Sequence, residues 1–447
     1  MAESPLTHPL AYLRHTHGWG VAEFARLMQD HGARLGVPLA TNRTTVWKWE
    51  HGQTPDRDAQ YVLADLLGVP ATDAAPDLWP AWLPVWEVAA LNAPWTLPGT
   101  VAAVEDLVRS ARMDRRGFLT ITGVSLTALA MSWAAAPSAF AAAAGGDRVT
   151  DNMLADLELR VGTLRSLDDQ MGGARLLEQA HGDLALITSL IRHARYTDAV
   201  GARLHSLAAQ VAYLTGWMAY DSGLHSAGQQ YYVAALRASR TAGDGDLGAF
   251  LLAEMGVHAS DGGYNRERAS LLRTALDQTP GTVPLVTRAY LYLHLAAALA
   301  QQQEHREAAS ALHRSVTLWD RTNDERGQWL KWFGESQINS TKGKVLLWAG
   351  RSEEATDFLA ASVSTAVPRD QAVRAGRLAE AHLAGGDLDG ALVAANHGIA
   401  LLEQRVASNR AVQRLHAFSG KLDRYGKEPA VREFRDRLKA LPELAAA

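Results

Sequence analysis

The sequence of 447 residues contains no cysteine. This absence excludes disulfide-bonded scaffolds, iron–sulfur clusters, cysteine-ligated zinc fingers and every thiol nucleophile. The chain also lacks a strong charge of either sign, because 44 Lys and Arg residues against 48 Asp and Glu residues give a net charge of −4. A polybasic protein that binds nucleic acid or membranes through its overall charge is therefore excluded, and any such role must lie in a local patch.

Hydrophobic residues are abundant, at 47% of the chain, whereas charged residues make up 21%. This composition is typical of folded domains and too rich in core-forming residues for a disordered scaffold. At roughly 100 to 200 residues per domain, the length predicts two to four domains. We predict an all-α protein with three parts: a head at residues 1–70, a linker region at residues 71–146 and a helical-repeat domain at residues 147–447.

Proline and tryptophan alternate in the first half of the linker region, at residues 76–98. Because proline removes a backbone donor and breaks helices, this span cannot form a single helix. We interpret it as a structured linker whose tryptophans pack against a neighbouring domain, since exposed indoles would favour aggregation. A ligand-binding aromatic patch is the alternative. The residues concerned are Pro76, Pro80, Pro84, Pro94 and Pro98, with Trp79, Trp82, Trp86 and Trp95.

The second half of the linker region has 30 consecutive residues without a charge, between Arg116 and Asp147. At roughly 1.5 Å per residue, this length is enough to cross a bilayer of about 30 Å. The preceding string RRGFL and the following Ala-x-Ala strings are similar to a twin-arginine export signal, but such signals act at the N-terminus. Because the segment is rich in alanine, threonine and serine, we favour a buried or linker helix in a cytoplasmic protein. The alternative is a membrane tether at residues 117–144 with arginines on its cytoplasmic flank.

Residues 147–447 show a helical repeat pattern. From Asp151 onward, apolar residues recur at i, i+3, i+4 and i+7 in segments of about 16 to 22 residues, which predicts amphipathic helices. The turns that separate paired helices fall near positions 223, 263, 303, 350 and 386. The intervals of 40, 40, 47 and 36 residues are irregular but lie in the range of stacked helical repeats. The pattern resembles divergent tetratricopeptide repeats, and it predicts an α-solenoid.

Stacked helical pairs form a concave inner surface, which is where such proteins bind their ligands. Aromatic and polar positions at helical spacing are candidates for that surface, although such stripes belong to the core more often than to a pocket. The candidate groove residues are Tyr213, Trp217, Tyr220, Tyr232, Tyr292, Trp332 and Asn339.

Patterns for metal ligation and catalysis are lacking. None of the 16 histidines falls in a His-x-x-x-His or His-Glu-x-x-His arrangement on one predicted helix face. No Gly-rich phosphate loop, nucleophile elbow or paired-carboxylate pattern stands out, and we interpret the Asp168-Asp169 doublet as an interhelical turn. We therefore expect no catalytic site, no metal and no cofactor, and a protein that is not an enzyme.

The first 70 residues have the most specific pattern in the chain. The string PLAYLRHTHGWGVAEFARLMQDHG predicts two helices around a Gly18-Trp19-Gly20 turn, and TNRTTVWKWEHGQTPDRDAQYVLADLLGVP predicts two more, the first capped by Asn42. This helix order, the Trp-Glu-x-Gly string and the terminal LADLLGV resemble the xenobiotic-response-element (XRE) class of helix-turn-helix domains, the phage-repressor type. The resemblance covers residues 7–70.

The resemblance implies that the helix beginning at Asn42 lies in the major groove of double-stranded DNA. Arg43, Thr44, Trp47 and Lys48 would then point toward the DNA. Arg43 is suited to a bidentate pair with guanine, and Lys48 reaches either a base or a phosphate.

The same resemblance implies a structural pair between Arg14 and Glu50, with Val46 and Trp49 facing the core of the head. A longer connection between the second and third helices adds Arg34 as a candidate contact to the DNA backbone. The head carries six Lys and Arg residues against seven Asp and Glu residues. We therefore expect weak non-specific affinity and a need for dimerisation.

The head also departs from the pattern of the class at the start of its second helix. Where the class usually has a Ser or Thr cap followed by Gln, which grip phosphate, this chain has Gly20 and Val21. A phosphate anchor is therefore missing or replaced.

The strings ARYTDAVGARLHSLAAQVAYLTGWMAYDSG and ALRASRTAGDGDLGAF, with RRGFL, resemble actinobacterial regulators that join this helix-turn-helix to tetratricopeptide-like repeats. The architecture is also similar to that of peptide-sensing regulators of Gram-positive bacteria. The resemblance implies a dimeric transcriptional regulator that binds an operator and senses a peptide, a small molecule or a protein partner. The alternatives are a membrane-tethered regulator and a tetratricopeptide adaptor that does not bind DNA.

Overall fold

The computed structural model describes residues 9–16, 19–51, 53–67, 69, 79–80, 83, 95–113, 129–130, 133, 148–261, 265–278, 283–322, 327–404 and 406–441. These residues form α-helices and short 3-10 helices, and none of them forms a β-strand. An isolated β-bridge joins Arg148 and Arg195. The predicted all-α class is confirmed.

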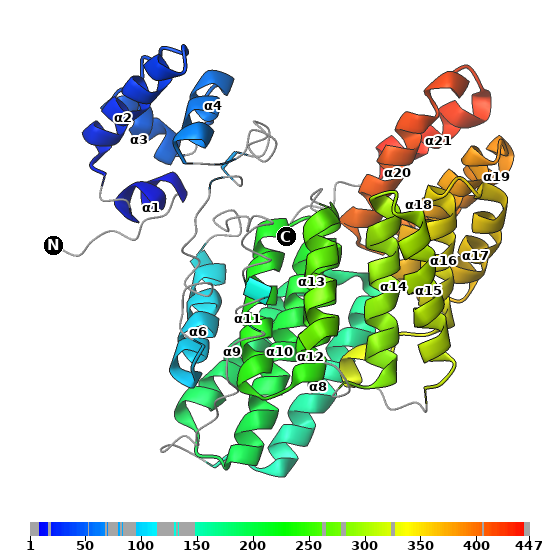
Figure 1. Cartoon of the computed structure of the whole chain (residues 1–447), viewed down its shortest axis with the longest axis horizontal. Helices are drawn as coiled ribbons and strands as arrows, with labels where there is room; N and C mark the ends of the chain where they lie inside the picture. The colour runs from blue at the N-terminus through cyan, green and yellow to red at the C-terminus, as the bar shows by residue number, and fades with distance from the viewer. Residues whose placement is uncertain are drawn as a thin grey trace.

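The helices form a small head followed by a larger repeat domain (Figure 1). Head helices are α1 (Pro9–Thr16), α2 (Val21–Arg34), α3 (Arg43–Glu50) and α4 (Arg57–Leu66). The remainder are α6 (Leu97–Met113), α8 (Asp151–Met171), α9 (Leu177–His193), α10 (Asp198–Asp221), α11 (His225–Thr241), α12 (Gly245–Asp261), α13 (Asn265–Gln278), α14 (Leu285–Gln301), α15 (His305–Trp319), α16 (Glu335–Trp348), α17 (Ser352–Ser364), α18 (Pro368–Ala384), α19 (Leu388–Glu403), α20 (Asn409–Lys421) and α21 (Pro429–Ala440).

The head has a hydrophobic core of its own. Phe24 and Met28 of α2 pack with Val46 and Trp49 of α3 and with apolar residues of α1 and α4. The side chain of Asn42 accepts a hydrogen bond from the backbone N–H of Thr45 at 3.0 Å, which caps α3. Satisfying an otherwise unpaired backbone donor in this way stabilises the start of a helix and defines where it begins.

The linker region contributes to both neighbouring cores. Trp79 packs against the core of the head, whereas α6 and the buried Trp133 belong to the main core of the repeat domain. The guanidinium of Arg237 lies 4.5 Å from the ring centre of Trp95, a favourable cation–π distance. Helix α6 and Trp133 of the linker region thus pack with the repeat domain.

Most of the predicted tether at residues 117–144, and the RRGFL string before it, lie outside the described residues. Leu129, Ala130 and Trp133, which fall within this span, are buried in the core of the repeat domain. Within the described ranges, we find no helix with the length and hydropathy needed to span a membrane.

The repeat domain consists of antiparallel helix pairs, α10 with α11 through α18 with α19, in which even-numbered helices form the inner layer. The described turns lie at Gly223, Gln303, Gly350 and Gly386, as the spacing predicts, while position 263 lies outside the described residues. Gly223 has a φ of 83°, a left-handed conformation that glycine adopts without strain. The helical repeats that the sequence predicts are thus present in the structure.

The two ends of the repeat domain meet. The backbone N–H of Ala407 donates to the carbonyl of Met171 at 2.8 Å, and Ser408 Oγ donates to Oδ1 of Asp221 at 2.9 Å. These contacts bring the start of α20 against α8 and α10, across almost 200 residues of sequence. The inner helices therefore line a partly open cavity, with the start of α20 held against α8 and α10.

A glycine at the junction of α8 and α10 tests this close packing. A Cβ atom on Gly173 would lie 2.5 Å from the backbone Cα of Met218, so Gly173→Ala must displace backbone. We expect it to lower the free energy of unfolding by about 1–3 kcal/mol, as overpacking does. The exposed Gly162 of α8 has open space around its Cβ position. Gly162→Ala should instead stabilise by about 0.5–1 kcal/mol. Urea denaturation measures both, and equal effects would contradict the packing described.

Candidate functional site

Helix α3 of the head exposes the side chains that the sequence assigns to DNA contact. Arg43, Thr44 and Lys48 are exposed, and Trp47 is 54% exposed with its ring stacked on His51 at 4.0 Å. The side chains of Arg43 and Lys48 form no hydrogen bond or ion pair with the part of the chain that the structure describes. Both cations are therefore available to a partner.

The opposite face of α3 is anchored. Val46 and Trp49 are buried, and Nε of Arg14 donates to Oε1 of Glu50 at 2.8 Å. Arg14 also donates through Nη1 to the carbonyl of Trp19 at 2.7 Å. This largely buried pair ties α1 and the following turn to the end of α3, which fixes the orientation of the exposed face.

The start of α2 differs from a phosphate-binding helix end. The backbone N–H of Gly20 donates to Oε2 of Glu23 at 3.2 Å. A carboxylate therefore occupies the position at the N-terminus of α2 where a phosphate group would bind. Arg34, at the other end of α2, is exposed and contacts His31. The start of α2 and Arg34 are the two candidates for contact with the DNA backbone, and only Arg34 presents a positive charge.

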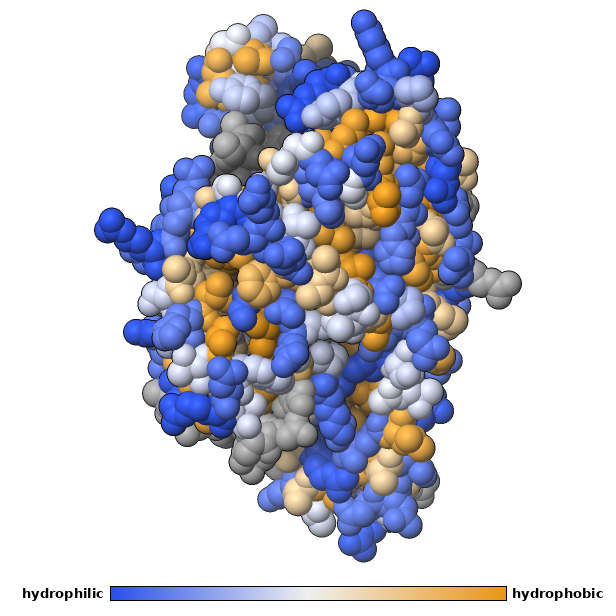
Figure 2. Space-filling model, turned by 90° about the vertical axis from the view of Figure 1, so that its right-hand side faces the viewer, coloured by the Kyte–Doolittle hydropathy of each residue, from blue (hydrophilic) through white to orange (hydrophobic). Residues whose placement is uncertain are grey.

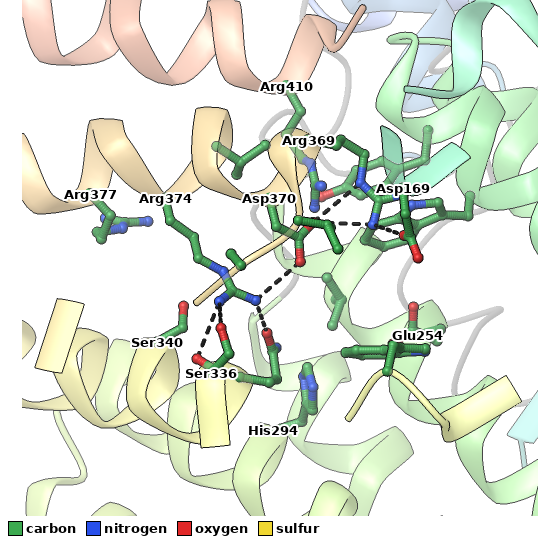
Figure 3. A pocket seen from close by; sticks show the side chains of 18 of the residues that line it. Asp169, Glu254, His294, Ser336, Ser340, Arg369, Asp370, Arg374, Arg377 and Arg410 are labelled. Atoms are coloured by element: carbon green, nitrogen blue, oxygen red, sulfur yellow. Dashed lines mark hydrogen bonds and ion pairs between the residues drawn. The ribbon is translucent and has the colours of Figure 1, made fainter. Parts of the chain in front are cut away.

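The second candidate site is a cavity of about 400 Å³ inside the repeat domain. Every even-numbered helix from α8 to α20 contributes to its wall, together with Arg268 of α13. Figure 3 shows side chains from α16 and α18 converging on it. A volume in this range is typical of small-molecule sites.

Carboxylates gather around Arg369 at one side of the cavity. Its guanidinium forms ion pairs with Asp168, with Asp169 at 3.0 Å and with Asp370 at 3.1 Å. Burial raises the pKa of Asp168 to about 7, and Arg369 opposes that rise. Burial would also raise the pKa of Asp370, but Arg369 and Arg374 lower it to about 2. The cluster joins α8 to α18 at the wall of the cavity.

A buried carboxylate, Glu254 of α12, connects three inner helices. It accepts hydrogen bonds from the hydroxyl of Tyr213 on α10, at 3.1 Å, and from the hydroxyl of Tyr290 on α14. Burial raises the pKa of Glu254, and the two tyrosine hydroxyls oppose this shift. Hydrogen-bonded buried groups of this kind hold neighbouring helices in one register.

Arginines line the other side. Arg374 donates to Ser336 Oγ at 2.6 Å, to Gln337 Oε1 at 2.8 Å and to Asp370 Oδ2 at 3.0 Å. Dashed lines in Figure 3 mark its contacts with Ser336 and Asp370. Arg377, one turn further along α18, donates to Glu380 at 2.7 Å. These contacts fix the two guanidinium groups at the cavity wall.

Four of the seven predicted groove residues line this cavity: Tyr213, Trp217, Tyr220 and Trp332. The other three lie elsewhere. Tyr232 is buried beside Tyr213 in the core, and Tyr292 lies under Arg314 of the outer helix α15. Asn339 is on α16, but Ser336 and Ser340 of that helix line the cavity in its place. Aromatic spacing on a helix identifies a stripe without saying which side of it faces the cavity.

The charged residues of the cavity were not predicted from the sequence. The interpretation of Asp168-Asp169 as an interhelical turn is wrong, because both residues lie within α8 and Asp168 is buried. Isolated arginines and lysines on amphipathic helices usually indicate solvated faces. The one signal available was the density of arginine along α18 and the start of α20.

Comparison with known proteins matches the head with a family. Residues 10–71 match the family described as SP15 N-terminal domain. No curated protein sequence matches the chain. A solved structure titled "Crystal structure of APC/C hetero-tetramer Cut9-Hcn1" is similar at 11% identity and a TM-score of 0.34, covering 91% of this chain and 69% of that chain. Similarity at this level carries no argument about function.

Proposed function

We propose that this protein is a dimeric, sequence-specific DNA-binding transcriptional regulator whose repeat domain binds a regulatory ligand. The observation that carries the proposal is the two-sided character of α3. One face is anchored in the head by Val46, Trp49 and the Arg14–Glu50 pair. The other presents Arg43 and Lys48 free of partners in the described ranges.

This geometry suits the major groove, which is wide enough to admit an α-helix. Arg43 is at the first position of α3, where side chains of recognition helices contact base edges. Thr44 and Trp47 lie between Arg43 and Lys48 and add polar and apolar contacts. The resemblance of residues 7–70 to the XRE class supports the same orientation.

A dimer is part of the proposal, because two heads are needed to read two half-sites about one helical turn apart. On the face of the molecule seen in Figure 2, hydrophobic residues form separate patches divided by hydrophilic side chains. Exposed large hydrophobic residues on α8 and α9 are better candidates for a dimer contact. These are Met153, Leu159, Leu167 and Leu186.

Selection from a pool of random DNA duplexes by the full-length protein tests the proposed function. The expected result is enrichment of one motif containing two related half-sites about one helical turn apart. Enrichment of a single half-site would contradict the dimer but not the DNA contact. A pool that stays random after repeated rounds would contradict DNA recognition.

The second candidate function is an adaptor that binds a protein and not DNA. Two observations favour it: Trp47 is exposed, and Glu23 lies at the N-terminus of α2, where it would repel a phosphate. Two results would support this candidate. The DNA pool would stay random in the selection experiment, and a protein partner would bind the natural protein but not Trp47→Ala.

A further inference from the structure

The charges that line the cavity are unequal. Eight cationic residues contribute to the wall, against four carboxylates. Three of those carboxylates surround Arg369, and the fourth, Glu254, is held by two tyrosines. The remaining wall contains a group that we call the cation cluster, formed by Arg268, Lys344, Arg374, Arg377 and Arg414. Arg374 also pairs with Asp370 and Arg377 with Glu380, whereas the side chains of Lys344 and Arg414 have no ion pair with the described part of the chain. Burying cations together is costly unless a negative charge compensates them.

Lys344 of α16 is the clearest member of this cluster. It has no hydrogen bond or ion pair to the described part of the chain. Burial, followed by the charges of Arg268, Arg377, Arg374 and Arg414, lowers its pKa well below the ordinary value. The positive charges of these arginines act against the ammonium form of Lys344, which is an unfavourable interaction in the unliganded fold. Binding sites often contain such unfavourable arrangements, which lower the stability of the free protein and are compensated when the ligand binds.

Three arginines of the cation cluster, Arg268, Arg374 and Arg377, are held in position by neighbouring side chains. Arg268 donates to Ser260 Oγ at 3.3 Å, to Gln301 Oε1 at 3.1 Å and to His294 Nδ1 at 3.2 Å. The guanidinium of Arg377 lies 5.4 Å from the ring centre of Trp348. Groups held in advance lose little freedom when an anion binds, which increases affinity.

We propose that the cation cluster binds the phosphoryl group of a small phosphorylated ligand. A phosphate ester carries close to two negative charges and three acceptor oxygens, which matches several converging guanidinium groups better than a single carboxylate does. The cavity volume of about 400 Å³ favours a ligand of nucleotide size over a protein segment. Trp332 lines the same cavity and is 36% exposed, so it offers a face to a planar ring.

This inference names the class of ligand that would control the regulator proposed above. The ligand's role as a regulatory signal rests on that proposed function. Binding itself can be measured without DNA. A protein that binds phosphate esters but selects no duplex would contradict the regulator and leave the cavity assignment intact. A protein that selects a duplex but binds no phosphate ester would contradict the cavity assignment and leave the DNA-binding proposal intact.

The experiment measures melting temperature and isothermal titration heat for the full chain with pyrophosphate, ribose 5-phosphate and the four common nucleoside 5′-monophosphates. Adenosine serves as the ring without phosphate, a short acidic peptide as the carboxylate probe, and potassium chloride at equal ionic strength as the salt control. The expected result is stabilisation by at least one phosphate ester and little by adenosine, peptide or salt.

Variants of one helix show where the phosphate binds. Lys344→Gln should weaken binding of the stabilising ester tenfold or more, while the unliganded variant melts at the same temperature as the natural protein or higher. Lys342→Gln is the matched control, because Lys342 lies two residues away on α16, over the ring of Phe358 and outside the cavity wall. It should leave binding unchanged.

A second variant keeps the test independent of Lys344. Arg414→Gln on α20 removes another cation that has no partner in the described part of the chain, and it should also weaken binding at least tenfold. The proposal is overturned if no phosphate ester stabilises the protein beyond the salt control, if the acidic peptide binds in their place, or if Lys344→Gln and Arg414→Gln bind like the natural protein.

Discussion

Replacing Arg369 with alanine is expected to lower the free energy of unfolding of the repeat domain by about 3–5 kcal/mol, which is typical when one partner of a buried ion pair is removed. Arg369 pairs with Asp168 across 201 residues of sequence and with Asp169 and Asp370. Its removal leaves three neighbouring carboxylates without a shared cation. The start of α18 then loses its charged contact with α8 at the wall of the cavity.

Urea denaturation of Arg369→Ala and of a surface control measures this effect. The control is Arg351→Ala, whose ion pair with Glu354 is exposed and joins residues of one turn. Surface pairs of this kind are worth about 0–1 kcal/mol. If Arg369→Ala costs no more than Arg351→Ala, the closure of the repeat domain by this cluster would be wrong.

On a selected duplex, Arg43→Ala is expected to weaken binding by about 1–3 kcal/mol while leaving affinity for a scrambled duplex unchanged. The reason is that a base contact contributes only where the matching base is present. Lys48→Ala, if the lysine contacts phosphate, should weaken both duplexes and reduce the salt dependence by about one unit of slope. Titrations of both variants at several salt concentrations distinguish the two roles. Unchanged affinity in both variants would remove α3 from the interface.

Local patterns predicted much of the fold. The turns at positions 223, 303, 350 and 386 follow from helix periodicity and short polar breaks, which depend on neighbouring residues only. The helix capped by Asn42 begins where the sequence indicates, and Val46 and Trp49, which the resemblance to the XRE class assigned to the core, are buried.

The closure of the repeat domain and the charged cavity were beyond such patterns. The pairs of Asp168 with Arg369 and of Asp221 with Arg410 join residues about 200 positions apart. Whether a solenoid stays open or closes depends on the sum of small rotations between its helix pairs, which no local signal encodes. Lys344 shows the same limit, since a lysine in an amphipathic helix usually faces water.

Guanine methylation interference on the selected duplex tests the central claim most directly, because N7 of guanine lies in the major groove and is one of the two acceptors that Arg43 would contact. The account predicts that N7 methylation of one guanine in each half-site blocks binding of the natural protein. The same methylation should no longer matter to Arg43→Ala, which has already lost that contact. Interference that is absent from the natural protein, or that is identical in Arg43→Ala, would contradict recognition of DNA by α3.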